Sequence, residues 1–131
     1  MVNKRILVVD DEAAIRRAVL RVLERHHYEV LLAASGDEAC ALLEGHTVDV
    51  VLLDLHMPGM SGATLFHVIA TQWPVLANRV VVMSGDTDAG SHESWLALNR
   101  LPLVSKPFQM HELLAVIESV IPKRLREVNG H

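Results

Sequence analysis

Short apolar runs alternate along the chain with longer segments in which apolar residues recur every three or four positions. Short runs rich in β-branched residues are typical of buried strands, and the wider spacing is typical of helices. Five strands are predicted, at residues 5–9, 28–34, 48–53, 80–83 and 101–105. Helices are predicted at residues 15–25, between the 35–38 turn and residue 45, and at residues 63–73, 87–100 and 110–121.

Alternation of strands and helices indicates an α/β protein built from parallel units with right-handed crossovers. For 131 residues, we expect a doubly wound, flavodoxin-like sheet with strand order 2-1-3-4-5. Pro102 marks the last strand as an edge strand, because proline cannot donate to a sheet ladder. No repeat or linker divides the chain, so we expect one domain at 1–131, with a core at about 5–121 and a tail at 122–131. The site of such a sheet lies where the strand order reverses, between strands 1 and 3.

Composition narrows the classes of function. Apolar residues make up 50% of the chain and charged residues 21%, which describes a folded protein. No apolar run approaches the roughly 20 residues that cross a bilayer, so we expect no membrane insertion. A single cysteine, Cys40, excludes an internal disulfide bond, and we expect a cytoplasmic protein. The net charge of −4 argues against nucleic acid as a direct partner.

Polar residues mark the exits of four predicted strands. Strand 1 runs into Asp10 and Asp11, strand 3 into Asp54, strand 4 into Ser84 and strand 5 into Lys106. The outlying strand 2 exits into uncharged residues. Because the carboxyl ends of parallel strands meet at one edge, we expect the charged side chains to converge there.

Converging carboxylates favour a hard cation that takes oxygen ligands, and Mg²⁺ fits best. An aspartate can also act as a nucleophile and form an aspartyl-phosphate, with Lys106 and the cation neutralising charge and Ser84 donating a hydrogen bond. Taken alone, Asp10 or Asp11 could cap a helix and Asp54 could start an Asx-turn. Their joint placement at neighbouring strand exits favours phosphoryl chemistry.

Four segments carry a family resemblance: Ile6 to Glu12, Asp54 to Gly62, Val80 to Gly85 and Lys106 to Phe108. As a set, in this order and spacing, they resemble the receiver domains of two-component response regulators, from Ile6 to about Ile121. The resemblance implies a phosphoacceptor rather than an enzyme with a separate substrate. It also implies a sensor histidine kinase or a histidine phosphotransfer protein as the phosphoryl donor.

The resemblance assigns roles to the acidic residues. Asp54 is the phosphoacceptor and also contacts Mg²⁺, for which Mn²⁺ is the expected substitute. Asp11 is the direct metal ligand, and Asp10 acts largely through water. The main-chain carbonyl of His56 is a further ligand.

The resemblance also implies a switch. Ser84 is the hydroxyl that moves towards the phosphoryl group, Lys106 is the cation beside Asp54, and the bond before Pro107 is the candidate cis peptide. Leu103 departs from the family, because most receivers carry a swinging aromatic residue three positions before the lysine. The surface of the fourth helix, fifth strand and fifth helix (residues 87–121), a candidate weak homodimer contact, is therefore expected to signal differently. Mobility of the weak helix at residues 87–100 is our hypothesis for that signal.

Two further residues are candidates for tuning the lifetime of the phosphoryl group. His56 lies two residues after Asp54, and Asp86 lies two residues after Ser84. Both are expected to border the path of attacking water, and so to affect dephosphorylation more than phosphorylation.

Three alternatives stand beside this interpretation. A phosphatase of the haloacid dehalogenase type would place a second aspartate where His56 stands. A flavodoxin-like electron carrier would need a phosphate loop rich in serine and threonine after strand 1. An interaction module that works without phosphorylation would not need Asp54, Ser84 or Lys106, so their presence argues against it.

Overall fold

The computed structural model describes residues 3–85 and 93–121. In chain order its elements are β1 (Arg5–Val9), α1 (Ala13–Arg25), β2 (Glu29–Ala33), α2 (Gly36–Gly45), β3 (Val50–Asp54), α3 (Gly62–Gln72), the 3₁₀ helix η1 (Pro74–Asn78), β4 (Val80–Gly85), α5 (Glu93–Leu98), β5 (Leu103–Lys106) and α6 (Met110–Val120).

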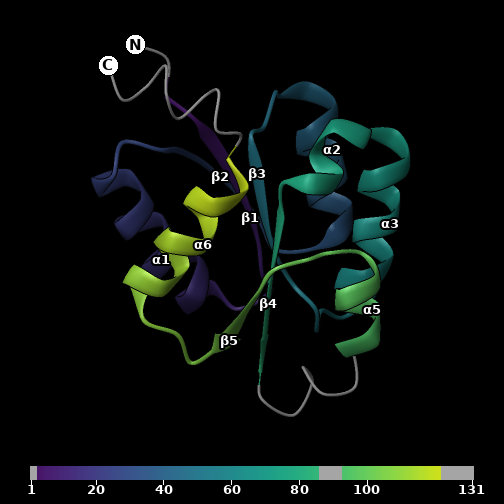
Figure 1. Cartoon of the computed structure of the whole chain (residues 1–131). Helices are drawn as coiled ribbons and strands as arrows, with labels where there is room; N and C mark the ends of the chain where they lie inside the picture. The colour runs from purple at the N-terminus through teal and green to yellow at the C-terminus, as the bar shows by residue number, and fades with distance from the viewer. Residues whose placement is uncertain (1–2, 86–92, 122–131) are drawn as a thin grey trace.

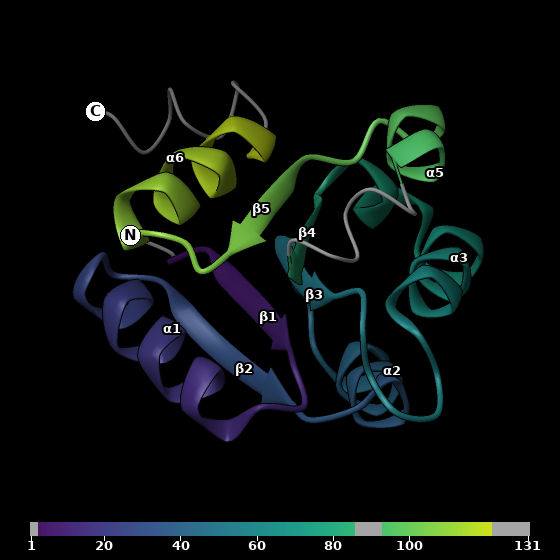
Figure 2. The same ribbon diagram turned by 90° about the horizontal axis from the view of Figure 1, so that it is seen from below.

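The strands form one parallel sheet in the order β2-β1-β3-β4-β5. Helices α1 and α6 cover one face of this sheet, and α2, α3 and α5 cover the other (Figure 1, Figure 2). The predicted fold class and strand order are confirmed. The order reverses between β1 and β3, so the carboxyl ends of these two strands define the expected place for a site.

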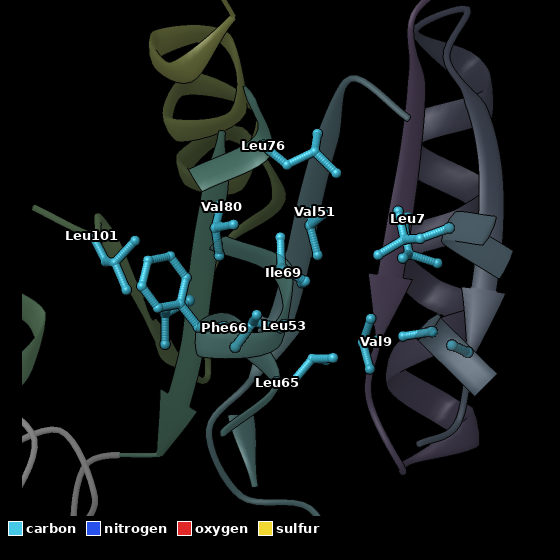
Figure 3. Packing of buried hydrophobic residues seen from close by; sticks show 14 of the residues in the cluster. Leu7, Val9, Val51, Leu53, Leu65, Phe66, Ile69, Leu76, Val80 and Leu101 are labelled. Carbon is cyan, nitrogen blue, oxygen red and sulfur yellow. The ribbon is translucent and has the colours of Figure 1, made fainter. Parts of the chain in front are cut away.

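Apolar side chains fill both faces of the sheet. All 5 residues of β3 are buried, as its unbroken apolar run predicts for a strand covered on both sides. On one face Leu7 and Val51 pack in a cluster with Ile69 of α3, which Figure 3 shows. On the other face, Ile6 packs in a second cluster with Leu23 of α1. The two clusters fix the sheet between its helix layers and hold the strand ends in register.

Four of the five strands differ from the prediction by one or two residues at their ends; β2 covers 29–33 instead of 28–34, and β3 covers 50–54 instead of 48–53. β4 continues through Ser84 to Gly85, and β5 begins at Leu103 instead of residue 101. Pro102 precedes β5, where its carbonyl accepts a hydrogen bond from the Val82 amide at 2.9 Å. The missing N–H of proline therefore delays the start of the strand, while its carbonyl still joins the ladder.

Two helical segments also differ. The short helix η1 was not predicted, because five residues are too few to display a helical period; Pro74 lies in its first turn, where a fixed φ favours helix formation. Helix α5 covers Glu93–Leu98, while residues 87–92 of the predicted helix lie outside the described residues. Among the helices described, none has both the length and the apolar character needed to span a membrane.

Candidate functional site

Three polar residues are buried in the part of the chain that the structure describes, and all lie at the carboxyl ends of the central strands. Asp10 is 0% exposed, Asp54 is 4% exposed and Ser84 is 1% exposed. Asp10 follows β1, Asp54 ends β3 and Ser84 is the penultimate residue of β4. The register of β3 and β4 places Asp54 opposite Met83, directly before Ser84. The structure thus brings together residues that the sequence placed at separate strand exits.

Lys106 at the end of β5 reaches into this group. Its Nζ donates a hydrogen bond to Asp10 Oδ2 at 2.8 Å and lies 3.4 Å from Asp54 Oδ2. The Glu12 carboxylate is a third neighbour, with Oε1 3.6 Å from the same nitrogen. Only 16% of the Lys106 side chain is exposed, so one largely buried ammonium faces three acidic groups.

Both buried aspartates are held in the same way. Asp10 Oδ1 accepts a hydrogen bond from the Glu12 amide at 2.9 Å, and Asp54 Oδ1 accepts one from the His56 amide at 3.2 Å. Each contact joins a carboxylate to the backbone two residues later, as in an Asx-turn. In each aspartate the Oδ1 atom is bound to the local backbone, and the Oδ2 atom faces Lys106.

Opposing effects set the pKa values of Asp54 and Lys106. Burial raises the pKa of the Asp54 carboxyl above its usual value, and the nearby Asp10 adds to this rise. The positive charge of Lys106 and the hydrogen bond from His56 act in the opposite direction without fully offsetting burial. Burial alone would lower the pKa of Lys106, but its hydrogen bond to Asp10 and the charges of Asp10 and Asp54 raise it overall. Lys106 therefore stays protonated at neutral pH.

Gly62 positions the backbone of Asp54. The Gly62 amide donates a hydrogen bond to the Leu55 carbonyl at 3.0 Å, which seats the first turn of α3 on the residue after Asp54. A Cβ at this glycine would lie 2.7 Å from Leu55 Cα and would collide with the carbonyl oxygen of Asp54. The loop before α3 was evident from the sequence, but this close approach was not. The glycine allows a helix to pack directly against the peptide that carries the site.

The acidic groups of the site form a cluster with the spacing of a metal site. Asp10, Glu12 and Asp54 each offer an oxygen, and these atoms lie within 4.8 Å of one another. Sequence reasoning did not single out Glu12, which is the N-cap residue of α1 and makes no side-chain capping hydrogen bond. Asp11 is exposed and lies outside this cluster. The metal roles of Asp11 and of the His56 carbonyl stay predictions.

The structure also describes most of the remaining predicted residues. Ser84 Oγ donates a hydrogen bond to the Gly85 carbonyl at 3.2 Å, and the Lys106–Pro107 peptide bond is cis. Leu103 is partly buried against the apolar cluster beneath α3 and α5. Asp86 lies outside the described residues.

The strand order and the buried acidic residues at one edge of the sheet define a class of protein. These are doubly wound α/β proteins with a charged site at the point where the strand order reverses. The family model of the response regulator receiver domain matches residues 6–118. The chain therefore belongs to the response regulator receiver domain family.

Known relatives agree with this assignment. The heme response regulator HssR of Staphylococcus saprophyticus is 31% identical over 125 residues, which are 95% of this chain and 54% of that protein. A CheY-like receiver domain protein from Methanospirillum hungatei has a TM-score of 0.85 at 26% identity, covering 96% of this chain and 99% of that one. Response regulator TrrA of Thermotoga maritima, in complex with Mg²⁺-BeF, has a TM-score of 0.78 at 30% identity, covering 90% and 99%. The chain spans about half the length of HssR.

Proposed function

We propose that the chain is a phosphorylation-dependent switch in which Asp54 accepts a phosphoryl group in a Mg²⁺-dependent reaction. The observation that carries this proposal is the arrangement of Lys106, which lies 2.8 Å from Asp10 and 3.4 Å from Asp54 at the reversal point of the sheet. Burying two carboxylates and one ammonium costs desolvation free energy, so we infer that the arrangement serves a purpose other than stability. Acceptance of a phosphoryl group is such a purpose.

The proposed reaction uses Asp54 as the nucleophile. An oxygen of its carboxylate forms a bond to phosphorus, while the bond between phosphorus and the donor's histidine nitrogen breaks and its electron pair returns to the imidazole. Lys106 stabilises the negative charge of the transferring group, because its ammonium already faces Asp54 Oδ2. Ser84, beside Asp54 in the adjoining strand, is the proposed hydroxyl that binds a phosphoryl oxygen.

The acidic cluster fits a small divalent cation. The oxygens of Asp10, Glu12 and Asp54 are of the kind that Mg²⁺ prefers, and Mn²⁺ accepts the same ligands. Asp11 and the His56 carbonyl are the proposed further ligands. When bound, the ion supplies positive charge that offsets the charge of the phosphoryl oxygens. The capture of Mg²⁺-BeF by TrrA, a structural neighbour, supports this proposal.

The proposed donor is a phosphohistidine on a sensor histidine kinase or on a histidine phosphotransfer protein. We propose no turnover of a separate substrate, because acceptance of one phosphoryl group is sufficient to account for the proposed roles of Asp54, Ser84 and Lys106.

Intact-mass spectrometry after incubation with acetyl phosphate tests the proposal. We expect one phosphoryl group per chain with Mg²⁺, none after chelation by EDTA, and none in Asp54→Asn or Asp54→Ala. Asp37→Asn is the matched control, because Asp37 is an exposed aspartate in the first turn of α2 and should leave labelling unchanged. A wild-type chain that acquires no Mg²⁺-dependent phosphoryl group would point to a receiver-shaped module that works without phosphorylation.

A further inference from the structure

Helices α3 and α5 lie side by side on one face of the sheet (Figure 1, Figure 2). A side-chain hydrogen bond joins them across 28 positions of sequence: Trp95 Nε1 of α5 donates to His67 Nε2 of α3 at 3.1 Å. His67 is exposed and Trp95 is half-buried, so the bond lies at the surface of the molecule. Neither residue belongs to the acidic site.

Aromatic packing holds this bond in place. Phe66, which is 4% exposed, meets Trp95 edge to face with ring centroids 5.7 Å apart and an interplanar angle of 89°. The His67 ring lies 5.6 Å from Phe66 and 6.0 Å from Trp95, in edge contacts as well. Edge-to-face pairs at these separations are favourable. The buried Phe66 thus fixes the indole so that its N–H points at the imidazole.

The chemistry of the two rings makes the bond sensitive to protons. An indole N–H can only donate, so the imidazole nitrogen that receives it must carry a lone pair. Protonation of His67 replaces this lone pair with a second donor, and the two N–H groups then oppose each other. A histidine side chain changes its charge between about pH 5 and 8. The contact therefore forms only with a neutral imidazole.

The described helices around His67 contain few ionisable groups. α3 contains no other ionisable side chain and η1 contains none, while α5 contains Glu93. α2, which packs on α3, contributes Asp37, Glu38, Cys40 and Glu44. His67 forms no ion pair with any of these among the described residues. Asp86, Asp88 and His92 precede α5 in the chain and lie outside the part that the structure describes.

We propose that the His67–Trp95 hydrogen bond is a proton-sensitive latch that fastens α5 to α3. The latch closes when His67 is neutral and opens when it is protonated. α5 is the next described element after β4, which contains Ser84. The latch supplies a route by which pH alters the packing of α5 on α3 without titrating the acidic site.

Tryptophan fluorescence between pH 5 and 8.5, without Mg²⁺ or a phosphoryl donor, tests the latch independently of Asp54. The difference between the wild type and Trp95→Phe isolates the signal of Trp95 from that of Trp73. We expect a red shift and loss of Trp95 emission as the pH falls through the range of histidine. His67→Gln should abolish this transition, because its amide oxygen accepts the hydrogen bond at every pH. His111→Gln, which replaces an exposed histidine on α6, should leave the transition intact.

Hydrogen exchange measured at pH 8 is the second test of the proposal. His67→Leu cannot accept the bond, so the amides of α5 should exchange faster in His67→Leu than in His67→Gln, while amides of α1 remain equal. The proposal is overturned if the Trp95 transition persists in His67→Gln, which would assign it to another group. Equal α5 exchange in the two variants would also overturn it, since the bond would then fasten nothing.

Discussion

The substitution Gly62→Ala tests whether the close approach of α3 positions the backbone of Asp54. The added Cβ would lie 2.7 Å from Leu55 Cα and 3.0 Å from the carbonyl carbon of Asp54, and it would overlap the Asp54 carbonyl oxygen. All three atoms belong to the backbone of a strand end in the middle of the sheet, so none can turn aside as a flexible side chain would. Either α3 must move outward or the Asp54 peptide must shift.

The expected change in the free energy of unfolding of Gly62→Ala follows from two opposing contributions. Overpacking of a well-filled interior costs roughly 1–3 kcal/mol, and the upper end applies here because the obstructing atoms are backbone. Replacing glycine with alanine also restricts the unfolded chain, which stabilises the fold by about 0.4–1 kcal/mol. The free energy of unfolding should therefore fall by about 2 kcal/mol. At roughly 4 °C for each kcal/mol in a domain of this size, the melting temperature should fall by about 8 °C.

Urea unfolding measures the loss, and Gly45→Ala provides the matched control. Gly45 is the last residue of α2 and is exposed, and a Cβ added there would meet nothing within 4 Å beyond its own helix and its neighbours in the chain. Alanine there should stabilise the protein by up to about 1 kcal/mol. Phosphorylation of Gly62→Ala by acetyl phosphate should also slow, because the carboxylate of Asp54 moves with its peptide. Equal unfolding free energies for Gly62→Ala and Gly45→Ala would refute the close approach of α3 to the site.

Further predictions concern the charged residues. Lys106→Met should lower the free energy of unfolding at neutral pH by about 3 kcal/mol, because Asp10 and Asp54 lose their largely buried partner; a urea midpoint equal to that of the wild type would contradict this. Asp54→Asn should be more stable than the wild type at pH 7. The folded state raises the pKa of Asp54, so ionisation of this carboxyl destabilises the fold above that pKa, and the advantage of the variant should vanish as the pH falls to the ordinary value of 3.8. Urea unfolding at pH 7 and pH 3.5 checks the sign, and an advantage that grows at low pH would disprove it. His56→Ala and Asp86→Ala should alter dephosphorylation more than phosphorylation, and unchanged decay of the phosphorylated protein in both variants would end that hypothesis.

Sequence pattern predicted the sheet well because burial on both faces leaves a strong signal. β3 reads as an unbroken apolar run and is buried throughout, and the strand order follows from alternation with helices. The same reasoning placed Asp10, Asp54 and Ser84 at one edge, where they are the buried polar residues of the described chain. Strand ends are predictable in this way because the topology, not the local sequence, brings them together.

The orientation of three consecutive acids was not predictable. Asp10 still donates its amide to the Ala33 carbonyl of β2 at 3.1 Å, so it continues the strand and its side chain turns into the protein. Asp11 then turns outward, and Glu12 lies at the start of α1 with its carboxylate near Lys106. Which of these side chains turns inward depends on where the strand stops and the helix begins. Boundaries of that kind are uncertain by a residue or two from pattern alone.

Contacts between helices could not be predicted from the sequence either. Nothing in the sequence indicates that Trp95 meets His67, because the contact requires α3 and α5 to pack on the same face in a particular register. The close approach at Gly62 has the same origin. Packing between elements decides such contacts, and a one-dimensional pattern contains little information about it.

The structure also distinguishes the two buried aspartates as candidate acceptors. Asp10 is bound tightly at both oxygens, at 2.9 Å to the Glu12 amide and 2.8 Å to Lys106. The corresponding distances for Asp54 are 3.2 Å and 3.4 Å, so its hydrogen bonds are weaker and its Oδ2 atom is less committed to the ammonium. A nucleophile must give up such contacts as its bond to phosphorus forms. We therefore propose Asp54 over Asp10 on physical grounds: its carboxylate loses less on reaction, while Asp10 keeps Lys106 in place for the product.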